Sequence, residues 1–154
     1  MLFDPKHEER LGGLEQELRR AHAITPDLLS DVIAQACTRF AAHGAATKAK
    51  VDRLVESGAW TDAVLALLEL ELPHWQLRRL IYEDGEWLCS LSKQPGLPLD
   101  LDDVAEASHE SLSLAILIAF LQARRAVAAS APGGTTVPQI RPAPIYAVCC
   151  DDFA

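Results

Sequence analysis

Apolar residues at helical spacing recur along most of the chain and predict a mostly helical protein. Helices are expected over residues 5–23, 26–42, 46–57, 61–72 and 111–130. The second helix begins at a clear signal, because Thr25 can cap the helix N-terminus and Pro26 suits its first position. Apolar residues surround the helix at 61–72 and the first half of the last helix, which predicts that both are deeply buried.

The helical pattern weakens toward the two ends of the chain. The first helix carries only a narrow stripe of leucines and contains Gly12 and Gly13, each of which weakens a helix by about 1 kcal/mol. Beyond Ser130 the composition changes to a proline-rich segment. We therefore expect a peripheral N-terminal helix at 1–24, a single core domain at 25–130 and a flexible tail at 131–154.

After residue 75 the period of the pattern changes from that of a helix to that of a strand. Asp84-Gly85 separates two β-prone runs, and an Asp-Gly pair in this position is typical of a two-residue hairpin turn. Such a turn places Tyr82 opposite Trp87, an aromatic pair that stabilises antiparallel strands. The same register places Leu80 opposite Cys89 and Arg78 opposite Leu91.

Both faces of this hairpin carry apolar residues, and a lone hairpin is only marginally stable in water. It must be covered by helices, extended by further strands or paired with a second copy. The fold class that follows is α+β: mostly helical, with one antiparallel hairpin packed against apolar helices. At the hairpin tip Glu83 and Glu86 face and repel each other. A bound cation or a basic partner can relieve this repulsion, but a solvated turn that resists edge pairing is favoured.

Charge and composition exclude several classes of function. The 154-residue chain has 14 basic and 22 acidic residues, and its net charge of −8 disfavours nucleic-acid binding. The longest uninterrupted apolar run, residues 114–121, is far shorter than the about 20 residues that a membrane span needs. The first ten residues do not resemble a signal peptide and the four cysteines form no C-x-x-C pair, so we expect a soluble cytoplasmic protein.

Four arginines and two aromatic residues are the candidates for contacting a ligand or a partner: Arg78, Arg79, Arg124, Arg125, Tyr82 and Trp87. The arginines can gather around an anion or a carboxylate. They can equally form ordinary ion pairs with the excess of acidic residues, and this second interpretation is favoured.

A metal site is a further hypothesis, formed by Glu106, His109 and Glu110. A glutamate and a histidine three residues apart on a helix can bind one metal ion, but di-iron helix bundles need two such pairs. The favoured alternative is a solvated helix entry, where acids interact with the positive end of the helix dipole. Cys149 and Cys150 can bind a soft metal or form a strained disulfide, although two free thiols are favoured.

Several short segments carry a resemblance to a known family: Leu-Val-Glu-Ser-Gly-Ala-Trp-Thr-Asp-Ala at 54–63, Leu-Arg-Arg-Leu at 77–80, Asp-Gly-Glu-Trp at 84–87, Ala-Ser-His-Glu at 107–110 and Leu-Ala-Ile-Leu at 114–117. On these segments residues 53–125 resemble a family of small uncharacterised alphaproteobacterial proteins. The resemblance implies no activity and assigns no catalytic residue. The hairpin followed by an apolar helix is also similar to phage-type α-β-α sandwich modules.

Familiar signatures of catalysis do not occur in the sequence: it has no Gly-x-Ser-x-Gly, no His-Glu-x-x-His, no phosphate-binding glycine loop and no dinucleotide fingerprint. We expect no cofactor and a small non-enzymatic interaction or regulatory module. Its partner would be another protein or a second copy, in a homodimer, bound through the hairpin edge or an apolar helix face. The alternative is a small enzyme or ligand-binding protein with a pocket between the hairpin and the last helix. Arg78, Arg79, His109 and Glu110 would supply the polar groups of that pocket.

Overall fold

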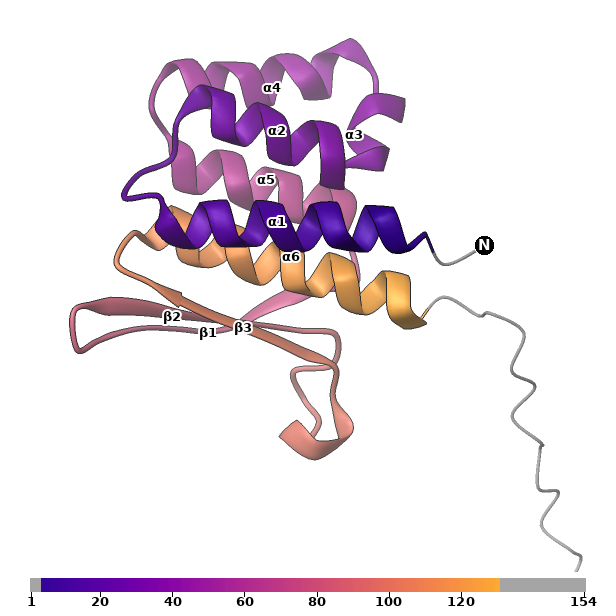
Figure 1. Cartoon of the computed structure of the whole chain (residues 1–154), viewed down its shortest axis with the longest axis vertical. Coiled ribbons are helices and arrows are strands. Elements are labelled where there is room, and N and C mark those ends of the chain that lie inside the picture. The colour runs from indigo at the N-terminus through magenta and orange to yellow at the C-terminus, as the bar shows by residue number, and fades with distance from the viewer. Residues whose placement is uncertain (1–3, 131–154) are drawn as a thin grey trace, which may run out of the picture.

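The computed structural model describes residues 4–130, which form the α+β, mostly helical fold that the sequence predicts (Figure 1). The helices are α1 (Pro5–Arg20), α2 (Pro26–Ala36), α3 (Thr38–Ala42), α4 (Ala45–Glu56), α5 (Trp60–Glu71) and α6 (Leu112–Ser130). The strands are β1 (Gln76–Glu83), β2 (Glu86–Ser92) and β3 (Val104–His109), with a short 3-10 turn at Leu99–Leu101 between the last two. The proline-rich segment and Cys149–Cys150 lie outside the described residues.

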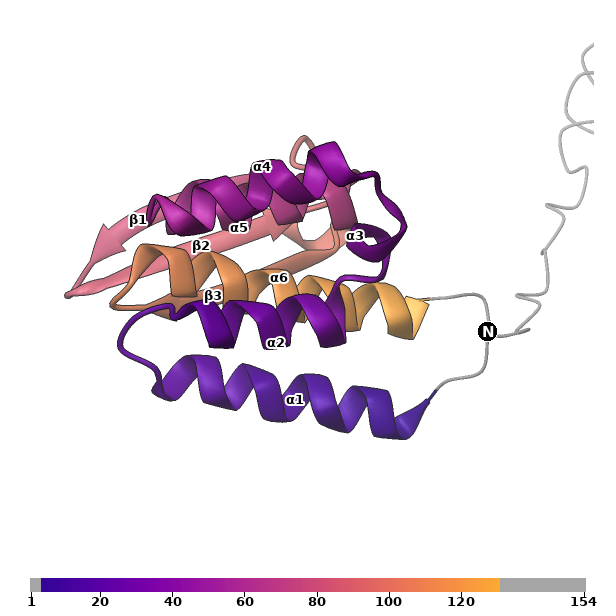
Figure 2. The same ribbon diagram turned by 90° about the horizontal axis from the view of Figure 1, so that it is seen from above.

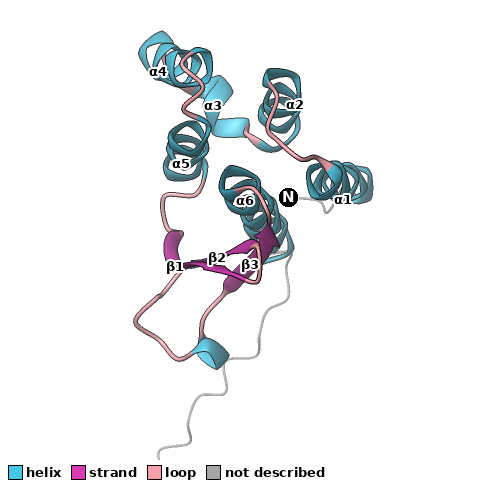
Figure 3. Cartoon of the chain, turned by 90° about the vertical axis from the view of Figure 1, so that its left-hand side faces the viewer, coloured by secondary structure: helices cyan, strands magenta, loops and turns pink. Residues whose placement is uncertain are grey.

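The six helices lie on one face of a three-stranded antiparallel sheet with the strand order β1-β2-β3 (Figure 1, Figure 3). Helix α6 packs on β2 and β3 on one side and on α1 and α5 on the other. Helix α5 lies above β1, whereas α1 lies on the β3 side of α6 (Figure 3). Seen from above, the long helices and the strands run along a common direction (Figure 2).

Helix α6 is the centre of the core. Its residues from Leu114 to Leu121 are at most 1% exposed, which confirms the deep burial predicted for this helix. By length and composition alone, the window Leu112–Ala129 is long and apolar enough to cross a membrane. In this fold the sheet and the flanking helices pack on α6, and 50% of that window is buried.

Helix α1, expected as a peripheral N-terminal helix, packs one face into the core. Leu11, Leu14 and Leu18 are at most 3% exposed and belong to the same apolar cluster as α6. The three leucines share one helix face, so a narrow stripe is enough to pack this helix against its neighbour. Gly12 and Gly13 have no atoms near the position where a side chain would lie, so they do not interrupt that packing.

The predicted helix at 26–42 is divided at Cys37 into α2 and α3. Its start is as predicted, because the Thr25 hydroxyl accepts a hydrogen bond of 3.2 Å from the backbone N–H of Leu28. At Cys37 the backbone leaves the helical conformation, with φ −107° and ψ 80°. The carboxylate of Glu71 in α5, which is 2% exposed, then accepts a hydrogen bond of 2.5 Å from the Phe40 N–H. A contact made across the fold thus satisfies a donor that the break releases.

Residues 104–109 form strand β3, where the sequence was expected to form a solvated helix entry. The burial of this segment alternates, with Ala105, Ala107 and His109 buried against the helices and Glu106 and Ser108 exposed. Two small alanines are compatible with a strand because α6 packs directly on it. The hairpin is therefore extended by a third strand, one of the three solutions that its apolar faces predict.

The hairpin itself has the predicted turn. Asp84 and Gly85 have φ values of 54° and 85°, as the two central residues of a type I′ turn require. The pairs Tyr82–Trp87 and Leu80–Cys89 are confirmed, and the two aromatic ring centroids are 5.1 Å apart. The predicted pair Arg78–Leu91 is wrong, since a β-bulge at Arg78 places Leu77 opposite Leu91 instead.

Candidate functional site

The four candidate arginines do not gather at one site. Arg78 Nη1 lies 2.9 Å from Asp102 Oδ2. Arg125 contacts two carboxylates of α1, with Nε 2.5 Å from Glu8 Oε1 and Nη1 2.9 Å from Glu15 Oε2. Arg79 is exposed on β1, and Arg124 lies half-buried on α6 near the Cys37 thiol. For Arg78 and Arg125 the structure thus shows ordinary ion pairs.

Asp102 links the connection between β2 and β3 to both strands of the hairpin. It accepts hydrogen bonds from Arg78, from the Ser92 hydroxyl and from the backbone N–H of Gln94. Burial acts to raise the pKa of Asp102, but these hydrogen bonds and the charge of Arg78 outweigh it and lower the pKa below its usual value. Asp102 is therefore a structural anchor, which the sequence alone did not indicate.

The proposed metal ligands Glu106, His109 and Glu110 do not have the helical spacing on which that hypothesis depended. In a strand, residues three apart point to opposite faces of the sheet. Glu106 is accordingly exposed, whereas His109 is buried on the helix-facing side. Within residues 4–130 no group of three or more histidine, cysteine, aspartate or glutamate side chains is arranged to hold a metal ion.

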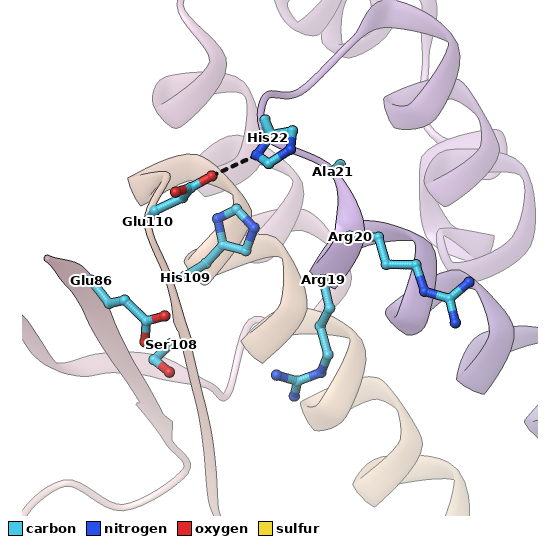
Figure 4. Close-up of a pocket in the computed structure, with 8 residues that line it drawn as sticks. All are labelled: Arg19, Arg20, Ala21, His22, Glu86, Ser108, His109 and Glu110. Atoms are coloured by element: carbon cyan, nitrogen blue, oxygen red, sulfur yellow. Dashed lines mark hydrogen bonds and ion pairs between the residues drawn. The ribbon is translucent and has the colours of Figure 1, made fainter.

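His109 and Glu110 instead line an open pocket of about 310 Å³ between the end of α1 and the end of β3, which we call the α1–β3 pocket (Figure 4). Its other lining residues are Arg19, Arg20, Ala21, His22, Glu86 and Ser108. His22 follows α1 and its Nδ1 atom lies 2.8 Å from Glu110 Oε1. The hydrogen bond and charge of His22 lower the pKa of Glu110. The pair joins two loops that are far apart in the sequence.

His109 has a defined orientation in this pocket. Its Nδ1 atom accepts a hydrogen bond of 2.9 Å from the backbone N–H of Ser111, so the neutral ring carries its proton on Nε2. Arg19 lies nearby but is engaged with Glu15, at 2.8 Å. Burial acts to raise the pKa of Glu15, but hydrogen bonds from Arg19, Gln122 and Arg125 lower it overall. The pocket thus has the oriented imidazole of His109 among its lining residues, whereas Figure 4 shows the Arg20 guanidinium directed away from it.

Nucleophilic catalysis has no arrangement of groups to support it in the described part of the chain. Among residues 4–130 no hydrogen bond joins a histidine ring to a serine hydroxyl or to a thiol. Burial raises the pKa of both described thiols, Cys37 and Cys89, to about 12. For Cys37 the negative charge of Glu71 adds to the effect of burial. Neither thiol is therefore activated as a nucleophile.

The second surface of interest is the outer edge of β1, which we call the β1 edge and define as residues 79–83. Within residues 4–130 strand β1 pairs only with β2, so no described strand pairs with the backbone groups on its other side. Within the described residues, no side-chain hydrogen bond or ion pair involves this segment; Leu80 packs against the apolar core, and the Tyr82 ring contacts that of Trp87. The Tyr82 side chain is 59% exposed, and that of Leu77 just before the segment is 41% exposed. The two aromatic candidates therefore lie together beside a free strand edge.

A groove of about 380 Å³ lies next to the start of β1, where the strand passes below the end of α5. It is lined mostly by apolar residues, namely Leu65, Leu68, Pro73, Trp75 and Leu77, with Glu69 and Gln76. The sequence did not predict this groove, because it forms between two elements whose relative placement depends on the whole fold.

No protein-family model, no curated protein and no solved structure matches this chain. The resemblance to small alphaproteobacterial proteins therefore stays a prediction. The function must be argued from the α1–β3 pocket and the β1 edge alone.

Proposed function

We propose that this protein is a non-enzymatic interaction module that binds an extended segment of a partner protein at the β1 edge. The observation that carries the proposal is that β1 is an eight-residue strand at the edge of the sheet that residues 4–130 form, with no described strand on its outer side. Unpaired N–H and C=O groups along such an edge form a template for another strand. Protein recognition by strand addition takes its affinity from these backbone groups and its specificity from alternate side chains.

The side chains of β1 favour this edge over that of β3. Tyr82 is exposed on β1 and contacts a second aromatic residue, Trp87, and aromatic residues are enriched in the cores of protein interfaces. Strand β3 is two residues shorter, and its exposed residues Glu106 and Ser108 include no aromatic or large apolar side chain. Of the two edges, that of β1 is therefore the better suited to a partner.

Photocrosslinking in cells tests this proposal. A photoreactive phenylalanine analogue replaces Tyr82 in one variant and Leu101, which is 71% exposed in the β2–β3 connection, in a control. We expect a covalent product with a protein partner from position 82 and none from position 101. The absence of any product at position 82, in a variant shown to be folded by circular dichroism, would contradict the proposal.

A second candidate function is the binding of a small polar ligand in the α1–β3 pocket. It is supported by His109 and Glu110, two of the four polar groups expected for a pocket between the hairpin and the last helix, which line this pocket together with Arg20. Titration with acetate or inorganic phosphate, followed by the NMR signals of the His109 ring, tests it. Saturable shifts that disappear in Arg20→Ala would favour this candidate, and unchanged signals would argue against it.

A cytoplasmic location is part of the proposal. Cys37 and Cys89 are free and buried, in agreement with a protein whose folding does not depend on disulfides within residues 4–130. Treatment with a reductant should leave the melting temperature of the full chain unchanged.

A further inference from the structure

We propose that the partner at the β1 edge is a second copy of this chain, related to the first by a two-fold axis that passes beside Ile81. The two sheets then join edge to edge into one continuous antiparallel sheet. This inference rests on the proposed function, because it names the occupant of the same edge. Four features of the β1 edge support it: its hydrogen-bonding pattern, its charges, its apolar residues and the regularity of the strand.

The hydrogen-bonding pattern follows from the turn. A two-residue type I′ turn closes with a hydrogen-bonded pair, here Glu83 and Glu86, and hydrogen-bonded and non-hydrogen-bonded pairs alternate along an antiparallel ladder. The N–H and C=O groups of Leu80 and Tyr82 therefore point away from β2. When Ile81 faces Ile81 of the second copy, Leu80 faces Tyr82 on both sides of the axis. These outward groups can then form reciprocal backbone hydrogen bonds.

The charges of the edge are complementary in this same register. Arg79 of each copy lies opposite Glu83 of the other, and pairs of opposite charge across strands are stabilising. Both side chains are exposed, and within the described residues neither forms an ion pair in its own chain. Glu83 also faces Glu86 across the hairpin, so an arginine from the second copy relieves a repulsion that the single chain leaves in place.

The apolar residues of the edge also meet in this register. On the outer face of the sheet, Ile81 pairs across the hairpin with Leu88, and both are half-buried in the single chain. The two-fold axis brings Ile81 and Leu88 of one copy next to the same pair of the other. On the helix-facing side, the half-buried Leu80 meets the exposed Tyr82 of the second copy. Burial of this apolar surface adds to the hydrogen bonds.

Other registers lose these matches. If one copy slides along the other by one residue, side chains that face the helices in one copy lie opposite side chains of the outer face in the other. The next symmetric register toward the start of the strand places Arg79 opposite Ile81. In that register Glu83 lies opposite a residue on the far side of the bulge at Arg78, where regular pairing has ended. The next toward the turn places Glu83 opposite Ile81. The bulge itself restricts regular pairing to residues 79–83, which is the segment that the proposed register uses.

Charge reversal tests the pairing directly. Analytical ultracentrifugation of the full chain is expected to show a dimer whose dissociation constant rises at least about tenfold in Arg79→Glu and in Glu83→Arg, because each variant places like charges opposite each other twice. An equimolar mixture of the two variants is expected to recover the affinity as a heterodimer, since both opposed pairs are then complementary. Arg53→Glu and Glu56→Arg in α4, on the far side of the helices from the sheet, are the matched controls and should change nothing.

A cysteine at the axis tests the register. In a background of Cys149→Ser and Cys150→Ser, Ile81→Cys is expected to form an intermolecular disulfide on mild oxidation, because directly opposed residues of a non-hydrogen-bonded pair lie at a suitable distance. Arg79→Cys alone should not form it. Arg79→Cys mixed with Glu83→Cys should do so. A disulfide formed by Arg79→Cys alone and not by Ile81→Cys would overturn the proposed register.

The proposed function and this inference can fail separately. A strict monomer at high concentration, or a dimer that is unaffected by both charge reversals, overturns pairing with a second copy. A crosslink from position 82 to a different protein would then still support the interaction module. Tyr82→Pro removes an outward N–H without removing a hydrogen bond between β1 and β2, so it should abolish the dimer while circular dichroism remains that of the native fold. A dimer that survives this substitution also overturns the inference.

Discussion

The two edges of the sheet belong to the same fold but have opposite surroundings. At the β3 edge, α6 packs directly on the strand, two alanines are buried, and His22 reaches from the end of α1 to Glu110. At the β1 edge, the side chains of residues 79–83 are exposed or half-buried and form no ion pair within the described residues. One row of side chains, Leu80–Cys89–Ala107, crosses the sheet and passes from half-buried to nearly inaccessible.

This difference arises from the position of α6 and not from the composition of the strands. Strand β1 contains larger apolar residues than β3, yet it is the more exposed of the two. The central helix lies over β2 and β3, so the strand with alanines is buried and the strand with leucine, isoleucine and tyrosine is left at the margin. Apolar residues at a margin are then available to a partner.

The strongest expected difference between the two edges comes from a charged residue placed at either end of the row Leu80–Cys89–Ala107. Ala107→Asp buries a carboxylate without a partner and should lower the free energy of unfolding by about 4 kcal/mol or more. Leu80→Asp, at the other end of the row, should lower it by only about 1–2 kcal/mol, because water can reach the new carboxylate. Urea unfolding measures both. Equal losses would show that the β1 edge is as enclosed as the β3 edge.

The helix that lies on the β3 side should be nearly as sensitive as the strand. Leu18→Ala in α1 removes a side chain with no exposed area and should cost about 2–5 kcal/mol. Leu101→Ala, at a 71% exposed residue, is the control and should stay within about 0.5 kcal/mol of the wild type. A small effect at Leu18, similar to that of the control, would mean that α1 frays from the core.

The anchor that joins the β2–β3 connection to β1 should make stability depend on pH. The folded state lowers the pKa of Asp102 below its ordinary value of 3.8, so its contribution is fully present above that value and is lost as the pH falls through the lower pKa of the folded state. Asp102→Asn should lower the melting temperature at neutral pH. Below pH 4 the melting temperature of this variant should fall less steeply with acid than that of the wild type. Thermal unfolding monitored over this range provides the measurement, with Asp100→Asn as an exposed control. If the melting temperature of Asp102→Asn fell with acid as much as that of the wild type, the acid sensitivity would come from other carboxylates.

The smallest expected effect concerns the His22–Glu110 pair at the β3 edge. The His22 side chain is 93% exposed, and an exposed ion pair contributes little to stability. His22→Ala should therefore leave the unfolding curve almost unchanged, while the NMR signals of Glu110 and of the neighbouring β3 backbone shift. A clear loss of stability would show that the loop after α1 holds the β3 edge in place.

Much of the fold could be predicted because its signals are local. The cap at Thr25, the turn at Asp84-Gly85 and the apolar run of α6 each depend on neighbouring residues, and the structure contains all three. The predicted helix at 61–72 begins one residue earlier, at Trp60. These signals were enough to identify the α+β class.

The errors share a physical cause, because each depends on a contact between distant segments. Residues 104–109 are polar and alanine-rich, and only the packing of α6 on them makes a strand favourable. The break at Cys37 is accompanied by a hydrogen bond from Phe40 to Glu71, more than 30 residues away. The pair His22–Glu110 spans 88 positions, and no local pattern indicates that these two residues meet. The candidate site is therefore less predictable than the fold, although His109, Glu110, Tyr82 and Trp87 were all identified as candidates.

The two buried thiols have a practical consequence for the study of local opening. Cys37 lies where α2 meets α3, whereas Cys89 lies in the central strand, and neither thiol ionises readily in the native fold. Each can react with an alkylating reagent only when its own surroundings open. Labelling rates at these two positions, followed by mass spectrometry of the resulting peptides, therefore report separately on the opening of the outer helices and of the sheet. Ligands or partners that bind at the β1 edge should slow the second rate more than the first.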